Sequence, residues 1–304
     1  MTPRRAHGAG GWDPIRIGSY AFSGLAGLAF LALGISLLAE SWPLWRQGAA
    51  GFLFGKTWFY RAQQFGILPM VYGTACVSAV ALALAAPLGI GAALFTAEVL
   101  PRRARLAVKT AIELLAGVPS VVYGLLGVLL LRDLVYRLLT PWDPLSGDTL
   151  LTAGLLLGIM VLPTITTLAD DALAGVPAAQ RLAARSLGLT RAEVALRVTL
   201  PQALPGIASA VALALGRALG ETIAVFLVVG RQDNQWPQRL LSPRPLGAAG
   251  QTITSKLGGS ETFLAYGDRQ HWGAITGLGL VLFVAVLGVS LLAARLATAG
   301  DGRA

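Results

Sequence analysis

Arg217 and Glu221 lie four positions apart in an otherwise apolar segment, so a helix would place both side chains on one face, one turn apart. They are the only two ionisable residues between Gly206 and Gly230. At a bilayer centre each would cost about 2.5–3.5 kcal/mol, so such charges face protein or a cavity rather than lipid. A guanidinium can hold an oxyanion through two parallel hydrogen bonds. The spacing therefore predicts an anion pathway in which Glu221 pairs with Arg217; an ion pair that only fixes the helix is the alternative.

The rest of the chain has the composition of a membrane protein. Of its 304 residues, 55% are hydrophobic and 13% are charged, and the mean hydropathy of +0.67 is too high for an ordinary soluble domain. The apolar residues come in long blocks, and a spanning helix needs about 20 of them in a row. Six blocks reach that length: about 17–39, 67–96, 112–131, 149–169, 206–230 and 273–295. We therefore predict an all-α polytopic membrane protein with six transmembrane helices.

The positive charges predict how these helices are oriented. The net charge is +9, but the basic residues are spread along the chain and form no single patch, which argues against nucleic-acid binding. With the N-terminus in the cytoplasm, thirteen Lys and Arg residues lie inside and ten outside, so both termini are expected in the cytoplasm. The first apolar run exceeds the roughly 7–15 residues of a signal-peptide core, and we expect it to be a retained helix.

Prolines interrupt two of the predicted spans. Pro119 lies in the third span, directly before Ser120, and Pro163 lies in the fourth. A proline frees a backbone carbonyl that neighbours must satisfy, which is typical where helices line a protected cavity, although a packing kink is the alternative. Ser120 and Tyr123 are therefore weaker candidates for hydroxyl contacts in the pathway, with hydrogen bonding inside the core as the other interpretation.

The segment 172–205, between the fourth and fifth predicted spans, is expected to form a helical hairpin on the cytoplasmic side. Pro177 suits the first turn of a helix. Gly188 can take the left-handed conformation that ends it. Thr190 and Glu193 have the spacing of a capping box, which would begin a second short helix.

This second helix is expected over 191–199, and the Leu-Pro pair at 200–201 would close the hairpin before the fifth span. Ala183, Ala184 and Gly188 give the hairpin a small face that suits close docking to another protein, with arginines at its rim. A solvated loop is the alternative.

The hairpin resembles that of the membrane subunits of ATP-driven importers. Their motif is E-A-A, three residues, G, nine residues, a β-branched aliphatic residue, one residue and L-P, and this chain keeps every spacing. It departs only at Leu182, where the family usually has a glutamate that can pair with the ATPase. The resemblance implies a coupling helix that docks into the nucleotide-binding subunit, and the MetI-like fold of type I importer permeases. The coupling residues it implies are Leu182, Ala183, Ala184, Gly188, Thr190, Glu193, Val198, Leu200 and Pro201.

Three further segments, 114–124, 162–164 and 214–222, look like the permeases of the phosphate-specific importer. With the hairpin, these matches span about 67–295. That system has two related permeases, C and A; the residues 222–225 and the long loop before the last span look more like the C type. The resemblance implies inorganic phosphate as the substrate, and sulfate or molybdate permeases are the nearest alternatives.

The same resemblance implies partners, a location and a domain division. The partners would be a second permease in a heterodimer, two copies of an ATP-binding subunit, and a periplasmic phosphate-binding protein that docks at the outer loops 40–66 and 231–272. The chain would be a multi-pass protein of the bacterial inner membrane, in contact with lipid. Residues 1–66 would form a tail, the first helix and an outer loop, and 67–304 the permease core with five helices.

Other possible sites are weaker. The residues 55–57 mimic the end of a nucleotide-binding P-loop but lack its first glycine and its strand–loop–helix context, so ATP hydrolysis is expected on a partner. Asp170 and Asp171 are expected at a solvated helix end rather than as an acid–base pair. His7 and His271 are far apart in the sequence, and no catalytic residue, metal site or cofactor is expected.

Two other classes of function are alternatives. A proton-coupled secondary anion transporter would use Glu221 as the proton carrier, but it predicts an internal repeat that the sequence does not show. An intramembrane enzyme would use Arg217 and Glu221 in catalysis, but it needs a nucleophile or metal cluster nearby.

Overall fold

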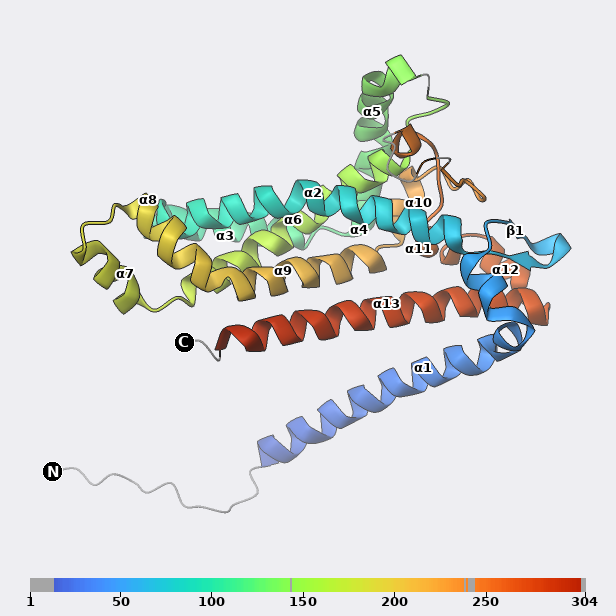
Figure 1. Cartoon of the computed structure of the whole chain (residues 1–304), viewed down its shortest axis with the longest axis horizontal. Coiled ribbons are helices and arrows are strands. Elements are labelled where there is room, and N and C mark those ends of the chain that lie inside the picture. The colour runs from blue at the N-terminus through green and yellow to red at the C-terminus, as the bar shows by residue number, and fades with distance from the viewer. Residues whose placement is uncertain (1–13, 143, 238, 240–243, 302–304) are drawn as a thin grey trace.

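The computed structural model describes residues 14–142, 144–237, 239 and 244–301 of the chain (Figure 1). Helices make up most of this structure, as predicted. The predicted cytoplasmic tail before residue 14, with Arg4, Arg5 and His7, lies outside the described residues, as do residues 302–304.

Within the part of the chain that the structure describes, five long helices are apolar enough to span a membrane, by length and composition. They are α1 (Pro14–Phe54), α2 (Leu68–Glu98), α6 (Leu150–Ala174), α9 (Leu200–Gly220) and α13 (Arg269–Asp301). All five run along the long axis of the molecule, and α1 diverges from the others toward its N-terminal end (Figure 1). The predicted spans 17–39 and 273–295 each fall within one of these helices, and 67–96 and 149–169 do so apart from their first residue.

The predicted span 112–131 is bent rather than straight. α3 (Arg102–Ala116) and α4 (Ser120–Leu126) are separated by residues 117–119, and the helix axis turns by 86° there. Pro119 has no backbone N–H and disfavours a helical conformation in the residue before it, so the helix breaks at this point. If this bent pair counts as one span, the described residues contain six spans, the number predicted.

Beyond the bend the chain still packs against α6, where a Cβ atom added to Gly127 would lie 2.8 Å from the side chain of Leu156. α4 continues through a π-helical turn, η2 (Gly127–Leu131), into α5 (Arg132–Leu139). α5 points across the direction of the long helices (Figure 1). A short 3-10 turn, η3 (Thr140–Trp142), precedes the return to α6.

α2 and α6 pack closely at the centre of the bundle through small residues. A Cβ atom added to Gly154 would lie 2.6 Å from the side chain of Val80. One added to Gly158 would lie 3.1 Å from the carbonyl oxygen of Ala81. Glycines at such positions let the backbones of two spanning helices approach each other. The two helices are therefore expected to move as one unit.

The predicted fifth span, 206–230, is divided into two helices. α9 ends at Gly220, and α10 (Ile223–Val228) begins after Glu221, whose backbone is extended (φ −70°, ψ 120°). The prediction of one continuous helix carrying both Arg217 and Glu221 is therefore wrong.

At its other end, α9 is continuous with the helical hairpin. The hairpin consists of α7 (Ala178–Ser186) and α8 (Arg191–Val194), and a π-helical turn, η4 (Ala195–Thr199), joins α8 to α9. The predicted helix end at 200–201 is wrong. A π turn relaxes the bonding pattern just where Pro201 lacks an N–H, so the helix passes through the proline without a break.

The end of the bundle opposite the hairpin, predicted to lie outside the cell, carries a small cap. β1 (Trp58–Phe59) and β2 (Gln64–Phe65) form an antiparallel ribbon in which Trp58 pairs with Phe65. α12 lies near this ribbon at the same end of the molecule (Figure 1). The remaining short elements are η1 (Tyr60–Ala62), η5 (Arg244–Gly247), α11 (Ile253–Leu257) and α12 (Glu261–Ala265).

Candidate functional site

Arg217 lies on α9 and hydrogen-bonds a threonine of α6. Its Nη1 atom donates to Oγ1 of Thr164 over 2.8 Å. Thr164 lies near the middle of α6 (Leu150–Ala174), so the guanidinium lies near the middle depth of the bundle. Arg217 is exposed in the described chain. A charge at this depth faces protein or a cavity rather than lipid, so this side of α9 is the side on which an anion could pass.

Glu221 has a different partner. Its Oε1 atom accepts a hydrogen bond from the N–H of Ala224, in the first turn of α10, over 3.1 Å. Both Arg217 and Glu221 lie in the described part of the chain, and no ion pair joins them there, so the predicted pair is wrong. The cause is that α9 ends at Gly220, so Glu221 does not lie on the helix face that carries Arg217. The free N–H groups at the start of a helix favour a carboxylate, and Glu221 stabilises the break in this way.

Ser120 and Tyr123 lie at the bend between α3 and α4. The Tyr123 hydroxyl donates to the carbonyl oxygen of Leu115 over 2.9 Å, across the bend. Carbonyls near a helix end have no partner within the helix, and Tyr123 supplies one. Ser120 is the first residue of α4 and is half-buried. A contact of either residue with an anion stays a prediction.

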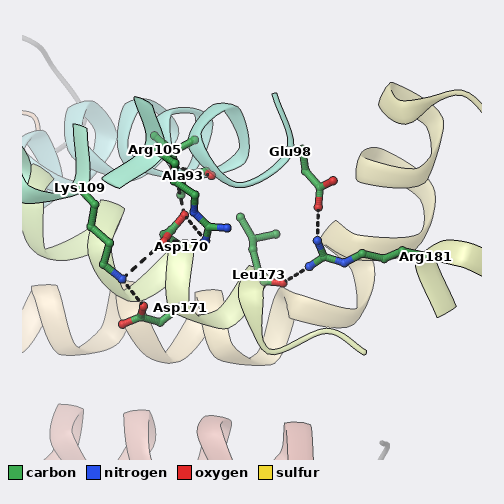
Figure 2. Close-up of polar contacts among 9 residues, drawn as sticks. Ala93, Glu98, Arg105, Lys109, Asp170, Asp171, Leu173 and Arg181 are labelled. Atoms are coloured by element: carbon green, nitrogen blue, oxygen red, sulfur yellow. Dashed lines mark hydrogen bonds and ion pairs between the residues drawn. The ribbon is translucent and has the colours of Figure 1, made fainter. Parts of the chain in front are cut away.

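A network of charged side chains joins three helices at the hairpin end of the bundle (Figure 2). Nη2 of Arg105, on α3, donates to both carboxylate oxygens of Asp170, on α6, at 3.0 Å. The Thr96 hydroxyl, on α2, donates to the same carboxylate over 3.1 Å. Lys109 Nζ lies 3.6 Å from Asp170 and 2.7 Å from Asp171. The ends of α2, α3 and α6 are thereby tied together.

The prediction of a solvated helix end is wrong for Asp170. Its side chain is 5% exposed, whereas that of Asp171 is 57% exposed. A buried carboxylate needs opposite charge and hydrogen bonds, and Arg105 and Lys109 supply them. Arg105 lies 65 residues earlier in the chain, so no local pattern around Asp170 reveals it.

The helical hairpin forms as predicted in its first half and at its turn. Gly188 has a φ of +87°, the left-handed conformation that favours glycine after a helix. Thr190 and Glu193 form the predicted capping box. The Glu193 N–H donates to Thr190 Oγ1 over 3.3 Å, and the Thr190 N–H donates to Glu193 Oε2 over 2.9 Å.

The exposed apolar face of the hairpin differs in part from the predicted small face. Leu182 and Leu187 are 65% and 83% exposed, and Ala183 and Gly188 are exposed as well. Ala184 is buried within the chain, because it lies on the opposite side of α7. A docking surface on this helix would therefore be built from leucines more than from small residues.

The second half of the hairpin presents a narrower surface. Val194 is fully buried, Val198 and Leu200 are half-buried, and Pro201 is exposed. Pro201 lies in the first turn of α9, directly after the π turn η4 that accommodates its missing N–H. These residues set the direction in which α9 leaves the hairpin toward Arg217.

Arg181, on α7, ties the hairpin to the long helices, a role that the sequence did not reveal. Its Nη1 atom lies 3.0 Å from Oε1 of Glu98, the last residue of α2, and its Nη2 atom donates to the carbonyl oxygen of Leu173 on α6 (Figure 2). The available signal was Glu98 itself, an acidic residue at the end of an apolar span.

A sequence model of the family described as "Binding-protein-dependent transport system inner membrane component" matches residues 85–303. The phosphate transport system permease protein PstC of Mesorhizobium japonicum is 35% identical over 268 residues, covering 83% of this chain and 79% of that one. PstC of Xylella fastidiosa (strain Temecula1) is 32% identical over 290 residues, covering 88% and 86%. PstC 1 of Mycobacterium bovis is 38% identical over 241 residues, covering 73% and 69%.

Two solved structures share the fold. An inward-facing MetNI methionine ABC transporter aligns with a TM-score of 0.52 at 16% identity, covering 77% of this chain and 94% of the other. A bacterial alginate ABC transporter aligns with a TM-score of 0.51 at 18% identity, covering 84% and 94%. These likenesses confirm the predicted fold of importer permeases. The chain therefore belongs to the family of binding-protein-dependent transport system inner membrane components, as a multi-pass permease of an ABC importer.

Proposed function

We propose that this chain is the C-type permease subunit of an ATP-driven importer and forms a pathway for inorganic phosphate across the bacterial inner membrane. The observation that carries the proposal is Arg217, a cation near the middle depth of the bundle that is held by the neutral hydroxyl of Thr164 and is exposed on one side. Three relatives that bear the name of a phosphate permease support the choice of substrate.

The chemistry at the end of α9 favours phosphate over sulfate. At neutral pH phosphate keeps a proton that it can donate, whereas sulfate has none. The Glu221 carboxylate, half-buried just beyond the end of α9, can accept that proton in a hydrogen bond and would repel sulfate. Arg217 attracts either anion, so discrimination falls to Glu221.

The hairpin is the element that would dock on the ATPase. Leu182, Ala183 and Leu187 form an exposed apolar face suited to a groove on a partner ATPase. A second permease would cover the open side of Arg217 and bring its own hairpin, which gives two copies of the ATPase. A periplasmic phosphate-binding protein would dock on the opposite cap, with the hairpin and both termini in the cytoplasm.

The test is phosphate uptake by proteoliposomes that contain the complete complex with Arg217→Gln. Loss of a charge-assisted contact of about 2 kcal/mol should lower ATP-driven uptake roughly 30-fold. Arg137→Gln is the matched control, because Arg137 is an exposed arginine on α5, away from the pathway.

Three results would contradict the proposal. Normal uptake by Arg217→Gln would remove Arg217 from the pathway. Competition by excess sulfate or molybdate as strong as that by phosphate would make the chain a permease for another oxyanion. Uptake that continues without ATP would favour a secondary transporter.

A further inference from the structure

Arg181 is placed to connect the docking hairpin with the transport helices. It is one of the residues of α7, the helix that carries the exposed Leu182 and is followed directly by the exposed Leu187. Its guanidinium reaches Glu98 at the end of α2 and the carbonyl oxygen of Leu173 in the last turn of α6 (Figure 2). One planar group thus contacts two long helices from the side of the hairpin.

The Arg181 contacts are largely shielded from water. The Glu98 side chain is 6% exposed and that of Arg181 is 20% exposed. Removing one member of a buried ion pair leaves an uncompensated charge, so the pair resists separation. The carbonyls at the C-terminal end of a helix such as α6 carry partial negative charge, which adds to the attraction.

The two helices that Arg181 contacts are locked to each other. Thr96, in the last turn of α2, hydrogen-bonds Asp170 of α6. Thr164, the partner of Arg217, lies nine residues before Leu173 on α6, about 13 Å along the helix axis. A displacement of Arg181 would therefore move α6, the helix whose Thr164 holds the guanidinium of Arg217.

We propose that Arg181 is a positioning residue that transmits movement of the ATPase-docked hairpin to α2 and α6. The proposal rests on the proposed function in one respect, namely that the hairpin docks on an ATPase. Without the Arg181 contacts, the peptide link between α6 and α7 would let α7 turn without moving the locked pair of α2 and α6. The fork of Arg181 makes hairpin, α2 and α6 one mechanical unit.

The test is the number of phosphate ions taken up per ATP hydrolysed by the complete complex in proteoliposomes. Arg181→Gln and Glu98→Gln should each lower this ratio about tenfold, since ATP hydrolysis continues while the helices fail to follow. The double variant should fall no further, because both changes break the same contact. Arg181→Lys should give an intermediate ratio, since a lysine keeps the charge but not the fork.

Arg295→Gln is the matched control, because Arg295 is exposed on α13 at the same end of the bundle; it should keep the wild-type ratio. A wild-type ratio for Arg181→Gln would overturn the proposal. Equal loss of ATPase activity and uptake, with the ratio unchanged, would also overturn it, because Arg181 would then be only structural. If Arg181→Gln fails to assemble, Glu98→Gln and Arg181→Lys are judged by the same two criteria. Absence of ATP-driven phosphate uptake by the wild type is a different result, and contradicts the proposed function instead.

Discussion

The cations at the hairpin end of the bundle and the cation at its middle depth have opposite surroundings. Arg105 and Lys109 meet the carboxylates of Asp170 and Asp171 within 3.0 Å. Arg217 hydrogen-bonds only a neutral hydroxyl among the contacts found in the described residues, and it is exposed. The first arrangement is neutral as a whole, and the second leaves a net positive charge.

This difference separates charges that hold the fold from a charge that can bind a ligand. A matched pair in a shielded site is strengthened by the low dielectric and has little attraction left for a passing ion. A guanidinium with a neutral partner keeps its attraction for an anion, but removing it from water without an opposite charge costs free energy. The contrast predicts large stability effects at the hairpin end and large transport effects at Arg217.

The largest expected effect is on stability, from Asp170→Asn. The change leaves Arg105 and Lys109 near a neutral amide in a buried site, which should cost about 3–5 kcal/mol. Thermal unfolding of the purified complex in detergent measures this loss. Asp171→Asn is the matched control, because Asp171 is largely exposed and its loss should matter far less. Similar losses for Asp170→Asn and Arg217→Gln would erase the distinction between the two regions.

A smaller effect is expected at Thr164, the hydrogen-bond partner of Arg217. Thr164→Val removes the hydroxyl that orients Arg217, and a hydrogen bond to a charged group contributes about 1.5–3 kcal/mol, so uptake should fall by a factor between roughly 10 and 150. Thr166→Val is the control, because the Thr166 hydroxyl only donates to the backbone of Leu162. The comparison would be weakened if Thr164→Val lowered the unfolding temperature and left uptake unchanged.

The sequence predicted what depends on runs of residues and on local caps. Long apolar blocks revealed the spanning helices, since a span needs little more than length and composition. The capping box at Thr190 and the left-handed Gly188 were visible because each depends on residues a few positions apart. The hairpin followed from the same short spacing, and its resemblance to the motif of importer permeases implied the link to an ATP-driven importer.

The sequence did not reveal partners that are distant along the chain. The pairing of Arg217 with Glu221 assumed an unbroken helix, but α9 ends at Gly220, and a local pattern could not show that Thr164 would replace the carboxylate. Asp170 was placed in solvent because Arg105 lies on another helix. Side chains that act between helices are therefore the part of the site that required three-dimensional structure.

A third charged region, in the cap, offers a finer test of matched charge. Lys256 is 3% exposed and contacts Asp233 at 2.6 Å and also Glu261. Glu261 further accepts hydrogen bonds from Trp58 Nε1 and faces His271 Nε2 at 2.9 Å. Like the hairpin end, this region pairs cations with carboxylates. Its two carboxylates differ in the number of partners, because Glu261 contacts Lys256, Trp58 and His271, whereas the contact found for Asp233 in the described residues is with Lys256.

This difference in partners shifts the pKa values of Glu261 and Asp233 in opposite directions. Burial would raise the pKa of Glu261, but hydrogen bonds from Lys256 and Trp58 outweigh it and hold that pKa below its ordinary value. Burial dominates at Asp233 and raises its pKa despite the bond from Lys256. At pH values above its ordinary pKa, Glu261 stabilises the cap, and this contribution is lost as the pH falls through the lowered pKa. Asp233 has the opposite effect: because its pKa is raised, its ionised form destabilises the cap, and protonation at lower pH removes that cost.

Because the two contributions oppose each other, the wild-type cap should depend only weakly on pH, which makes this the smallest expected effect. Asp233→Asn removes the opposing contribution, so the cap of that variant should lose protection more steeply as pH falls below about 4.3. Hydrogen exchange of the amides of α11 and α12, corrected for the intrinsic effect of pH, measures the loss. Lys256 and His271 are present in both proteins and cancel from the comparison. Parallel pH profiles of the two proteins would contradict this prediction. They would mean that Asp233 does not contribute to the pH dependence of the cap, and that Glu261 alone accounts for it.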